Sequence, residues 1–273
     1  MASADFPANA FYEPLGEDGA FASTVATAGP WSPDFQHAGP VAALMGRAFE
    51  RHEPAPGTRV ARVTLEILGP VPVAELRVTA RTVRPGRRIT LLEAEMTHEG
   101  RPVARASAWR IAAAPAALEP TANAPAPPPL PDLGPDARTR STAWSGAHVD
   151  GYIAAMEWRF TEGSFGRPGP GAVWARTRIP LVAGEAVSPL QRALLLADSA
   201  SGLGSELDFA KWLVINTDLT VALHRDPSGE WLRMWAALHA DPGGSGLVEA
   251  TLADRDGDLG RVLQTLLVDE AAT

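Results

Sequence analysis

Apolar and polar residues alternate along several segments of the first half of the chain. Between residues 59 and 68, Val63, Leu65 and Ile67 alternate with polar or charged neighbours, as in a strand with one buried face. Turn residues separate the following segments, for example at Pro85-Gly86 and Glu99-Gly100. The pattern therefore predicts an antiparallel meander of four strands, over residues 59–68, 74–84, 87–98 and 101–111.

A helix is predicted ahead of this meander, over residues 38–52. No charged residue lies between His37 and Arg47, and the segment is rich in Ala and Gly. Small side chains permit close packing against a neighbouring element. A short strand is also expected over residues 20–27.

The second half repeats this order of elements. Two strand-like segments, 151–165 and 171–179, precede a helix that begins near Ser188, a plausible N-cap followed by Pro189. Four further strands are predicted over residues 212–224, 230–239, 247–254 and 259–268. The repeat indicates an internal duplication. Each half is expected to wrap an antiparallel sheet around a central helix, which makes the fold class α+β.

A connector rich in Pro and Ala separates the halves. Proline lacks an amide donor and fixes its own φ, so this stretch suits neither a helix interior nor a central strand. The predicted division is a first domain over residues 1–112, a linker over 113–140 and a second domain over 141–273.

Composition excludes several classes of protein. The net charge is −8 and the chain has no cysteine, so disulfides and thiolate nucleophiles are excluded. An acidic chain has no electrostatic reason to bind nucleic acid or an anionic membrane. No apolar run approaches the roughly 20 residues that span a bilayer, and the first residues lack the order of a signal peptide. A cytoplasmic protein is the expectation.

Several segments resemble one known family, and together they cover nearly the whole chain outside the linker. They are WSPDFQHAGPVAALMGRAFER, RPGRRITLLEAEMTHEGRPVARASAWRI, SPLQRALLLADSASG, NTDLTVALHR and QTLLVDE. These segments are similar to the thioesterase-like superfamily, whose members are double hot-dog proteins related to bacterial acyl-CoA thioesterase II. The resemblance implies two tandem hot-dog domains that form an intramolecular pseudo-dimer, with their sheets joined edge to edge. It also implies a role in fatty acid metabolism.

The resemblance implies hydrolysis of acyl-CoA to free fatty acid and CoA, without a metal or organic cofactor. The family positions the attacking water with an Asp on the second helix, a Thr or similar residue on the next strand and a Gln on the last strand. These positions fall on Asp198, Asn216 and Gln264, with Thr217 beside Asn216. Asn in place of Thr is a departure from the family pattern.

The residues themselves favour the same sites. The helix around Asp198 is apolar almost all round, so a carboxylate there needs hydrogen-bond partners or a function. As a general base, Asp198 would take a proton from the attacking water; the alternative is a structural carboxylate bonded to a turn. Gln264 interrupts an apolar strand, and its counterpart in the first half is Ala108, as expected if one active site survives. A buried structural amide is the other reading of Gln264.

Neighbouring residues on a strand face opposite ways, so only one of Asn216 and Thr217 can point at the helices. Alignment with the family favours Asn216, and the alternation places Asn216, Asp218 and Thr220 on one face. At the start of the first helix, backbone N–H groups near His37 and Gly39 are candidates for polarising a substrate carbonyl. Gly39 would also let the substrate approach closely. An ordinary capped helix start explains the same residues.

Two other functions stay open. His37 with Asp198 imitates the dyad of hot-dog hydratases and dehydratases, and a chain without activity would be an acyl-CoA binding protein. The histidines show no metal-ligand spacing. The acyl chain is expected to lie between the two helices, and association into a homo-oligomer is compatible with this arrangement.

Overall fold

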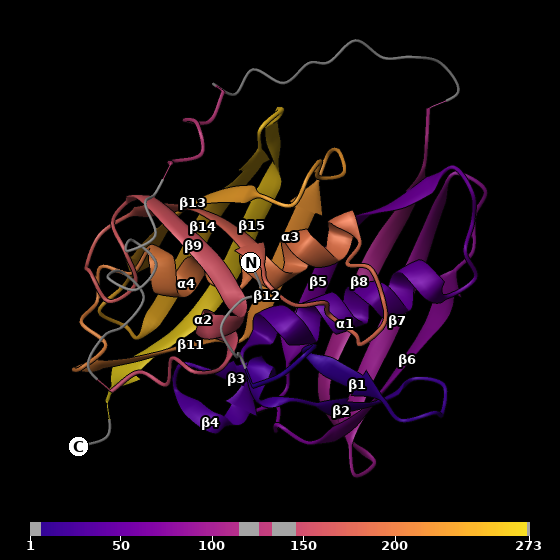
Figure 1. The fold of residues 1–273 in the computed structure, drawn as a ribbon, viewed down its shortest axis with the longest axis horizontal. Coiled ribbons are helices and arrows are strands. Elements are labelled where there is room, and N and C mark those ends of the chain that lie inside the picture. The colour runs from indigo at the N-terminus through magenta and orange to yellow at the C-terminus, as the bar shows by residue number, and fades with distance from the viewer. Residues whose placement is uncertain (1–6, 115–125, 133–145, 272–273) are drawn as a thin grey trace.

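The computed structural model describes residues 7–114, 126–132 and 146–271. A thirteen-stranded antiparallel sheet dominates them, with the strand order β1-β2-β6-β7-β8-β5-β12-β15-β14-β13-β10-β9 and with β11 paired to β15. In Figure 1 the indigo-to-magenta first half and the orange-to-yellow second half lie side by side, with β5 and β12 at their junction.

The first half contains one long helix, and the predicted strands of its meander are confirmed to within two residues at each end. A small two-stranded sheet and a 3-10 turn precede that helix. The elements are β1 (Tyr12–Pro14), β2 (Ala20–Ser23), η1 (Val25–Thr27), β3 (Ala28–Gly29), β4 (Ser32–Gln36), α1 (Ala38–Arg51), β5 (Thr58–Ile67), β6 (Glu75–Arg84), β7 (Ile89–His98) and β8 (Arg101–Ala112).

The second half repeats the arrangement with a shorter central helix. Ser188 caps that helix through a capping box with Gln191, which satisfies backbone donors of its first turn. The elements are α2 (Tyr152–Ala155), β9 (Met156–Glu162), β10 (Gly171–Thr177), α3 (Pro189–Ala197), α4 (Ala200–Leu203), β11 (Trp212–Asn216), β12 (Asp218–Leu223), β13 (Leu232–Ala240), β14 (Ser245–Asp254) and β15 (Gly257–Glu270).

The two halves correspond strand by strand and meet through β5 and β12. Each half has its four meander strands in the same spatial order, β6-β7-β8-β5 and β13-β14-β15-β12. At the junction Thr64 lies opposite Thr220, and their hydroxyls are 3.1 Å apart. The edge-to-edge pairing predicted for the two sheets is therefore confirmed.

The helices α1 and α3 pack directly against each other, antiparallel. The start of α1 meets the end of α3, and at the other end Glu50 accepts hydrogen bonds from Ser188 Oγ at 2.9 Å and Gln191 Nε2 at 2.8 Å. A Cβ at Gly39 would overlap the carbonyl oxygen of Leu195, and one at Gly46 would overlap the side chain of Leu194. The helices therefore touch directly at both glycines, and an acyl chain between them stays a prediction.

Three predicted strands differ from the structure. The segment 20–27 is a strand only over β2 and continues into the 3-10 helix η1. The segment 151–165 begins with the short helix α2, and the segment 212–224 is interrupted at Thr217. Asn216 pairs with Leu266 of β15, and Thr220 pairs with Leu263. The chain therefore advances four residues on one side of this ladder and three residues on the other. One extra residue is a β-bulge, which re-aims side chains.

The predicted linker over 113–140 lies for the most part outside the described residues. Of its described part, the Pro128 carbonyl accepts from Trp174 Nε1 at 3.2 Å and the Pro131 carbonyl accepts from Arg159 Nη1 at 2.9 Å. These contacts place the Pro-rich segment against β9 and β10, where Trp174 is 1% exposed. Proline has no backbone N–H group to donate, but its carbonyl oxygen accepts hydrogen bonds, so this segment satisfies these two donors.

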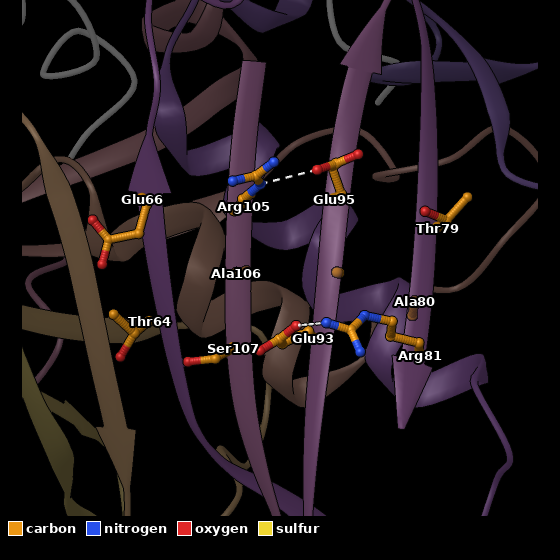
Figure 2. Close-up of a pocket in the computed structure, with 11 residues that line it drawn as sticks. Thr64, Glu66, Thr79, Ala80, Arg81, Glu93, Glu95, Arg105, Ala106 and Ser107 are labelled. Carbon is orange, nitrogen blue, oxygen red and sulfur yellow. Dashed lines mark hydrogen bonds and ion pairs between the residues drawn. The ribbon is translucent and has the colours of Figure 1, made fainter. Parts of the chain in front are cut away.

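A hollow of about 650 Å³ lies on the outer face of the first half's sheet. Figure 2 shows acidic and basic side chains of neighbouring strands pointing toward one another there, with the pair Arg105–Glu95 at 2.9 Å and the pair Arg81–Glu93. These ion pairs are exposed, and exposed pairs contribute little to stability. Within the described parts of the chain, no helix is long and apolar enough to cross a membrane.

The contact between α1 and α3 predicts an unusual effect of Gly39→Ala. Alanine is ordinarily about 1 kcal/mol better than glycine inside a helix. At Gly39 the added methyl meets a backbone oxygen of α3, so we expect overpacking to lower the free energy of unfolding by about 1–3 kcal/mol. Urea unfolding measures this. The control is Gly69→Ala, whose Cβ meets nothing within 4 Å; equal stability of the two variants would contradict the prediction.

Candidate active site

A cavity of about 400 Å³ opens beside the junction of α1 and α3. Its walls come from the segment before α1, from the first turn of α1, from the loop after β5, from the end of α3 and from β11. Exposed apolar side chains line it, and polar residues face it from the helix ends and from β11. The apolar residues include Trp31, Phe35, Leu68, Leu213 and Ile215, and the polar ones include His37, Asp198 and Asn216.

Asp198 is the C-terminal cap residue of α3, and its carboxylate is surrounded by donors. Its side chain is 5% exposed. Oδ1 accepts from Asn216 Nδ2 at 2.7 Å and from Gln264 Nε2 at 3.0 Å, while Oδ2 lies 3.1 Å from His37 Nδ1. A buried carboxylate is costly unless such partners compensate it. The three predicted catalytic residues, Asp198, Asn216 and Gln264, therefore come together in space.

Asn216 reaches Asp198 because of the bulge at Thr217. Val214 is buried on β11 and Leu219 on β12, so the inward positions are even-numbered before the bulge and odd-numbered after it. The expectation that Asn216, Asp218 and Thr220 share one face was wrong for this reason. Asn216 points inward to Asp198, whereas Thr220 pairs with Thr64 on the outer face.

Gln264 lies on β15, is fully buried and reaches the site only through Asp198. Its Oε1 has no hydrogen-bond partner among the described residues. With Thr64 and Thr220 as equivalent positions, the registers make Ala108 the counterpart of Gln264, as the sequence predicts. The same registers make Val60 the counterpart of Asn216. The matching positions in the first half are therefore apolar.

His37 is the N-cap residue of α1, and its ring forms one wall of the cavity. Gly39 N–H donates to Nδ1 at 3.1 Å, on the same nitrogen that faces Asp198. Burial lowers the pKa of His37, and the negative charge of Asp198 opposes that shift. His37 is therefore a neutral imidazole near pH 7.

Tyr152 was not recognised from the sequence. Its ring stacks on the ring of His37, with centroids 3.8 Å apart and planes 9° apart. Its hydroxyl donates to the Leu195 carbonyl at 2.6 Å and lies 2.8 Å from Ser199 Oγ. Burial raises the pKa of this hydroxyl. A Tyr in a strand-like stretch carries no signal for this contact, because α2 and α1 are more than 100 residues apart in the chain.

The two remaining predicted residues, Gly39 and Thr217, have different surroundings. Thr217 lines the cavity, and its hydroxyl donates to the Thr265 carbonyl at 3.2 Å. Gly39 faces the Leu195 carbonyl and is not among the cavity-lining residues. Its small size serves the contact between the helices, which differs from the predicted approach of a substrate.

No group of three residues suited to holding a metal ion occurs in the part of the chain that the structure describes. The polar atoms around Asp198 are instead amide and imidazole nitrogens. Amide N–H groups donate hydrogen bonds and do not coordinate cations.

The fold is a duplicated scaffold, and polar side chains converge on Asp198 in its second half. Two family models match the chain: the acyl-CoA thioesterase N-terminal domain over residues 27–111 and the acyl-CoA thioesterase C-terminal domain over residues 121–268. The chain belongs to the acyl-CoA thioesterase family and is a thioester hydrolase. A comparison with curated proteins found no match.

Solved structures share the fold over nearly the whole chain. A hot-dog protein of unknown function from Alicyclobacillus acidocaldarius is 19% identical, with TM-score 0.67, covering 94% of this chain and 95% of that one. Acyl-CoA thioesterase II TesB2 from Mycobacterium marinum is 16% identical, with TM-score 0.66 and coverage of 96% and 95%. The tesB protein of Mycobacterium avium subsp. paratuberculosis is 17% identical, with TM-score 0.65 and coverage of 94% and 96%. The predicted tandem hot-dog fold is confirmed.

The variant Gln264→Leu distinguishes the role of Gln264 in positioning Asp198 from its role in the stability of the fold. The substitution removes one donor to a buried carboxylate, a loss of about 1.5–3 kcal/mol, and it also removes the unpartnered Oε1, whose burial costs about 1–3 kcal/mol. We expect the thermal midpoint to change little while hydrolysis falls roughly tenfold or more, because Asp198 loses its fixed orientation. Melting curves and CoA release measure the two effects. Unchanged activity would show that Gln264 does not position Asp198.

Proposed function

We propose that this chain hydrolyses fatty acyl-CoA at the cavity beside Asp198, by direct attack of water on the thioester carbonyl. The negative charge of Asp198 supplies the basicity that activates the water. Asn216 and Gln264 hold that carboxylate in place. The observation that carries the proposal is the convergence of three donors on one buried carboxylate at the wall of an apolar cavity.

The surroundings suit an acyl thioester. Apolar side chains at the cavity rim, including Trp31, Phe35 and Ile215, offer contact to an acyl chain. Ala38 lies in the first turn of α1 and lines the same cavity. Backbone N–H groups of a first turn have no intrahelical partner and carry positive partial charge. The N–H of Ala38 is therefore our candidate for polarising the thioester oxygen.

Direct attack by water fits the residues at the site. The described cavity wall offers the hydroxyls of Ser32, Ser201 and Thr217. Thr217 donates its hydroxyl to the Thr265 carbonyl at 3.2 Å, and neither serine hydroxyl is hydrogen-bonded to a histidine or carboxylate among the described residues. The chain has no cysteine, so a thiolate nucleophile is excluded. A covalent acyl-enzyme has no evident nucleophile here, whereas a water molecule needs only the carboxylate and its partners.

Asp198→Asn tests the proposal with little change in shape. An amide cannot supply the negative charge, so we expect CoA thiol release from acyl-CoA to fall by about 10²–10⁴. A panel of acyl-CoAs of increasing chain length, assayed with wild type and variant, also identifies the preferred acyl group. Circular dichroism and the thermal midpoint check that the variant is folded.

The other candidate functions give different results in the same assay. Wild type that releases no CoA from any acyl-CoA would overturn the proposal. If that protein hydrates an enoyl-CoA, the His37–Asp198 dyad of a hydratase explains the site. If it binds acyl-CoA without converting it, the chain is a binding protein. Full activity of Asp198→Asn would leave hydrolysis standing and remove Asp198 as the source of basicity.

A further inference from the structure

The contacts of Asp198 leave open which atom takes the proton of the attacking water. Its Oδ1 already accepts two amide hydrogen bonds, and its Oδ2 faces His37 Nδ1 at 3.1 Å. His37 has a second nitrogen, Nε2, which has no partner among the described residues. The same ring lines the cavity. The imidazole therefore contacts the carboxylate and, like Asp198 itself, borders the space where a substrate would bind.

Two contacts compete for His37 Nδ1. This nitrogen cannot accept the N–H of Gly39 and donate to Asp198 at the same time, because it carries either a lone pair or a proton in the ring plane. A hydrogen bond to a carboxylate is roughly twice as strong as one between neutral groups. A bare Nδ1 would also place its lone pair against the Asp198 oxygen. The proton therefore belongs on Nδ1, shared with Asp198.

Placing the proton on Nδ1 also determines the protonation state of Nε2. A neutral imidazole with its proton on Nδ1 has a lone pair on Nε2. Nε2 is then a proton acceptor at the cavity wall, and Asp198 holds the ring and stabilises the imidazolium that forms after proton transfer, as the carboxylate does in other acid–His pairs.

We propose that His37 Nε2 is the general base of the reaction and that Asp198 acts through it as a positioning residue and counter-charge. This inference rests on the proposed function and names the atom that carries out its first step. The water oxygen forms a bond to the thioester carbon while its proton moves to Nε2. The tetrahedral intermediate then expels the CoA sulfur, and the Nε2 proton moves to that sulfur. The carbon–sulfur bond breaks, free acid and CoA thiol leave, and His37 returns to its starting tautomer.

Tyr152 holds the ring that performs this step. The stack of Tyr152 on His37, together with the hydrogen bonds of its hydroxyl to the Leu195 carbonyl and Ser199, anchors the imidazole plane to the end of α3. Such fixed orientation matters because a general base must lie within hydrogen-bond reach of the proton that it takes. Tyr152→Leu removes the stack, whereas Tyr152→Phe keeps it and loses only the hydroxyl.

The proposed role of His37 beside Asp198 predicts how kcat/KM depends on pH. The ionisable groups that contact His37 are Asp198 at the end of α3 and Tyr152 of α2. Burial lowers the pKa of His37 below its ordinary value of 6.5, and Tyr152 stays neutral because burial raises its pKa. A base works only when unprotonated, so kcat/KM should be constant near pH 7–8 and fall in a limb below pH 6.5.

The test is His37→Asn in the full chain, with the pH profile of CoA release as readout. Asn is a good N-cap residue and preserves the start of α1, yet it has no nitrogen that accepts a proton. We expect kcat/KM at pH 7.5 to fall by about 10²–10⁴, and the acidic limb to disappear from the residual activity. The control is His98→Asn on the sheet, whose ring contacts the Glu75 carbonyl far from the cavity; it should keep wild-type rate and profile.

The outcomes separate the inference from the proposed function. An active wild type with a folded, fully active His37→Asn variant would overturn the role of His37 while leaving hydrolysis intact. Nitrogen NMR of histidine-labelled wild type gives a second measurement that does not depend on folding of a variant. A proton on Nδ1 of His37 supports the inference, and a proton on Nε2 with a bare Nδ1 overturns it. Tyr152→Leu should lower kcat more than Tyr152→Phe, and the reverse order would contradict the anchoring by the stack.

Discussion

The antiparallel contact between α1 and α3 is the constraint on which the site depends. Glycines at two positions of α1 allow the backbones to approach closely, and a polar contact closes each end of the pair. At one end Glu50 accepts hydrogen bonds from two neutral donors. At the other end the cap of α1 meets the cap of α3, and His37 comes to face Asp198. The proposed site thus lies where the ends of two helices are held together.

Duplication explains why only one end of this contact became a candidate active site. The sheet registers relate the halves through Thr64 and Thr220, so each polar residue of the site has an identifiable counterpart. Val60 and Ala108 stand where Asn216 and Gln264 would be needed. A carboxylate placed there would lack its amide donors and would be costly to bury. The apolar copy is instead free to contribute to the core.

Sequence patterns predicted the architecture well because it depends on periodicity, which local residues encode. Alternation and turn residues placed the strands of both meanders, and the same alternation failed at Thr217, where one extra residue shifts the phase of β12. Asp198, Asn216 and Gln264 were predicted through family resemblance. The resemblance also implied that they meet around one water molecule, but the residues alone could not show that two amides would contact one oxygen of Asp198, because residues on three elements meet only after folding. Tyr152 gave no signal, because a stacking contact between distant segments leaves no pattern in either one.

The contacts that already surround the Asp198 carboxylate affect how it would act on a substrate. A carboxylate that accepts two amides on one oxygen and faces an imidazole on the other has most of its lone pairs occupied. Residues that hold the carboxylate therefore also occupy positions from which it would contact a water molecule directly. Passing the charge through His37 resolves this conflict, because the imidazole gains basicity from the anion while presenting its own lone pair. Burial acts against protonation of the ring, which keeps the base ready near neutral pH.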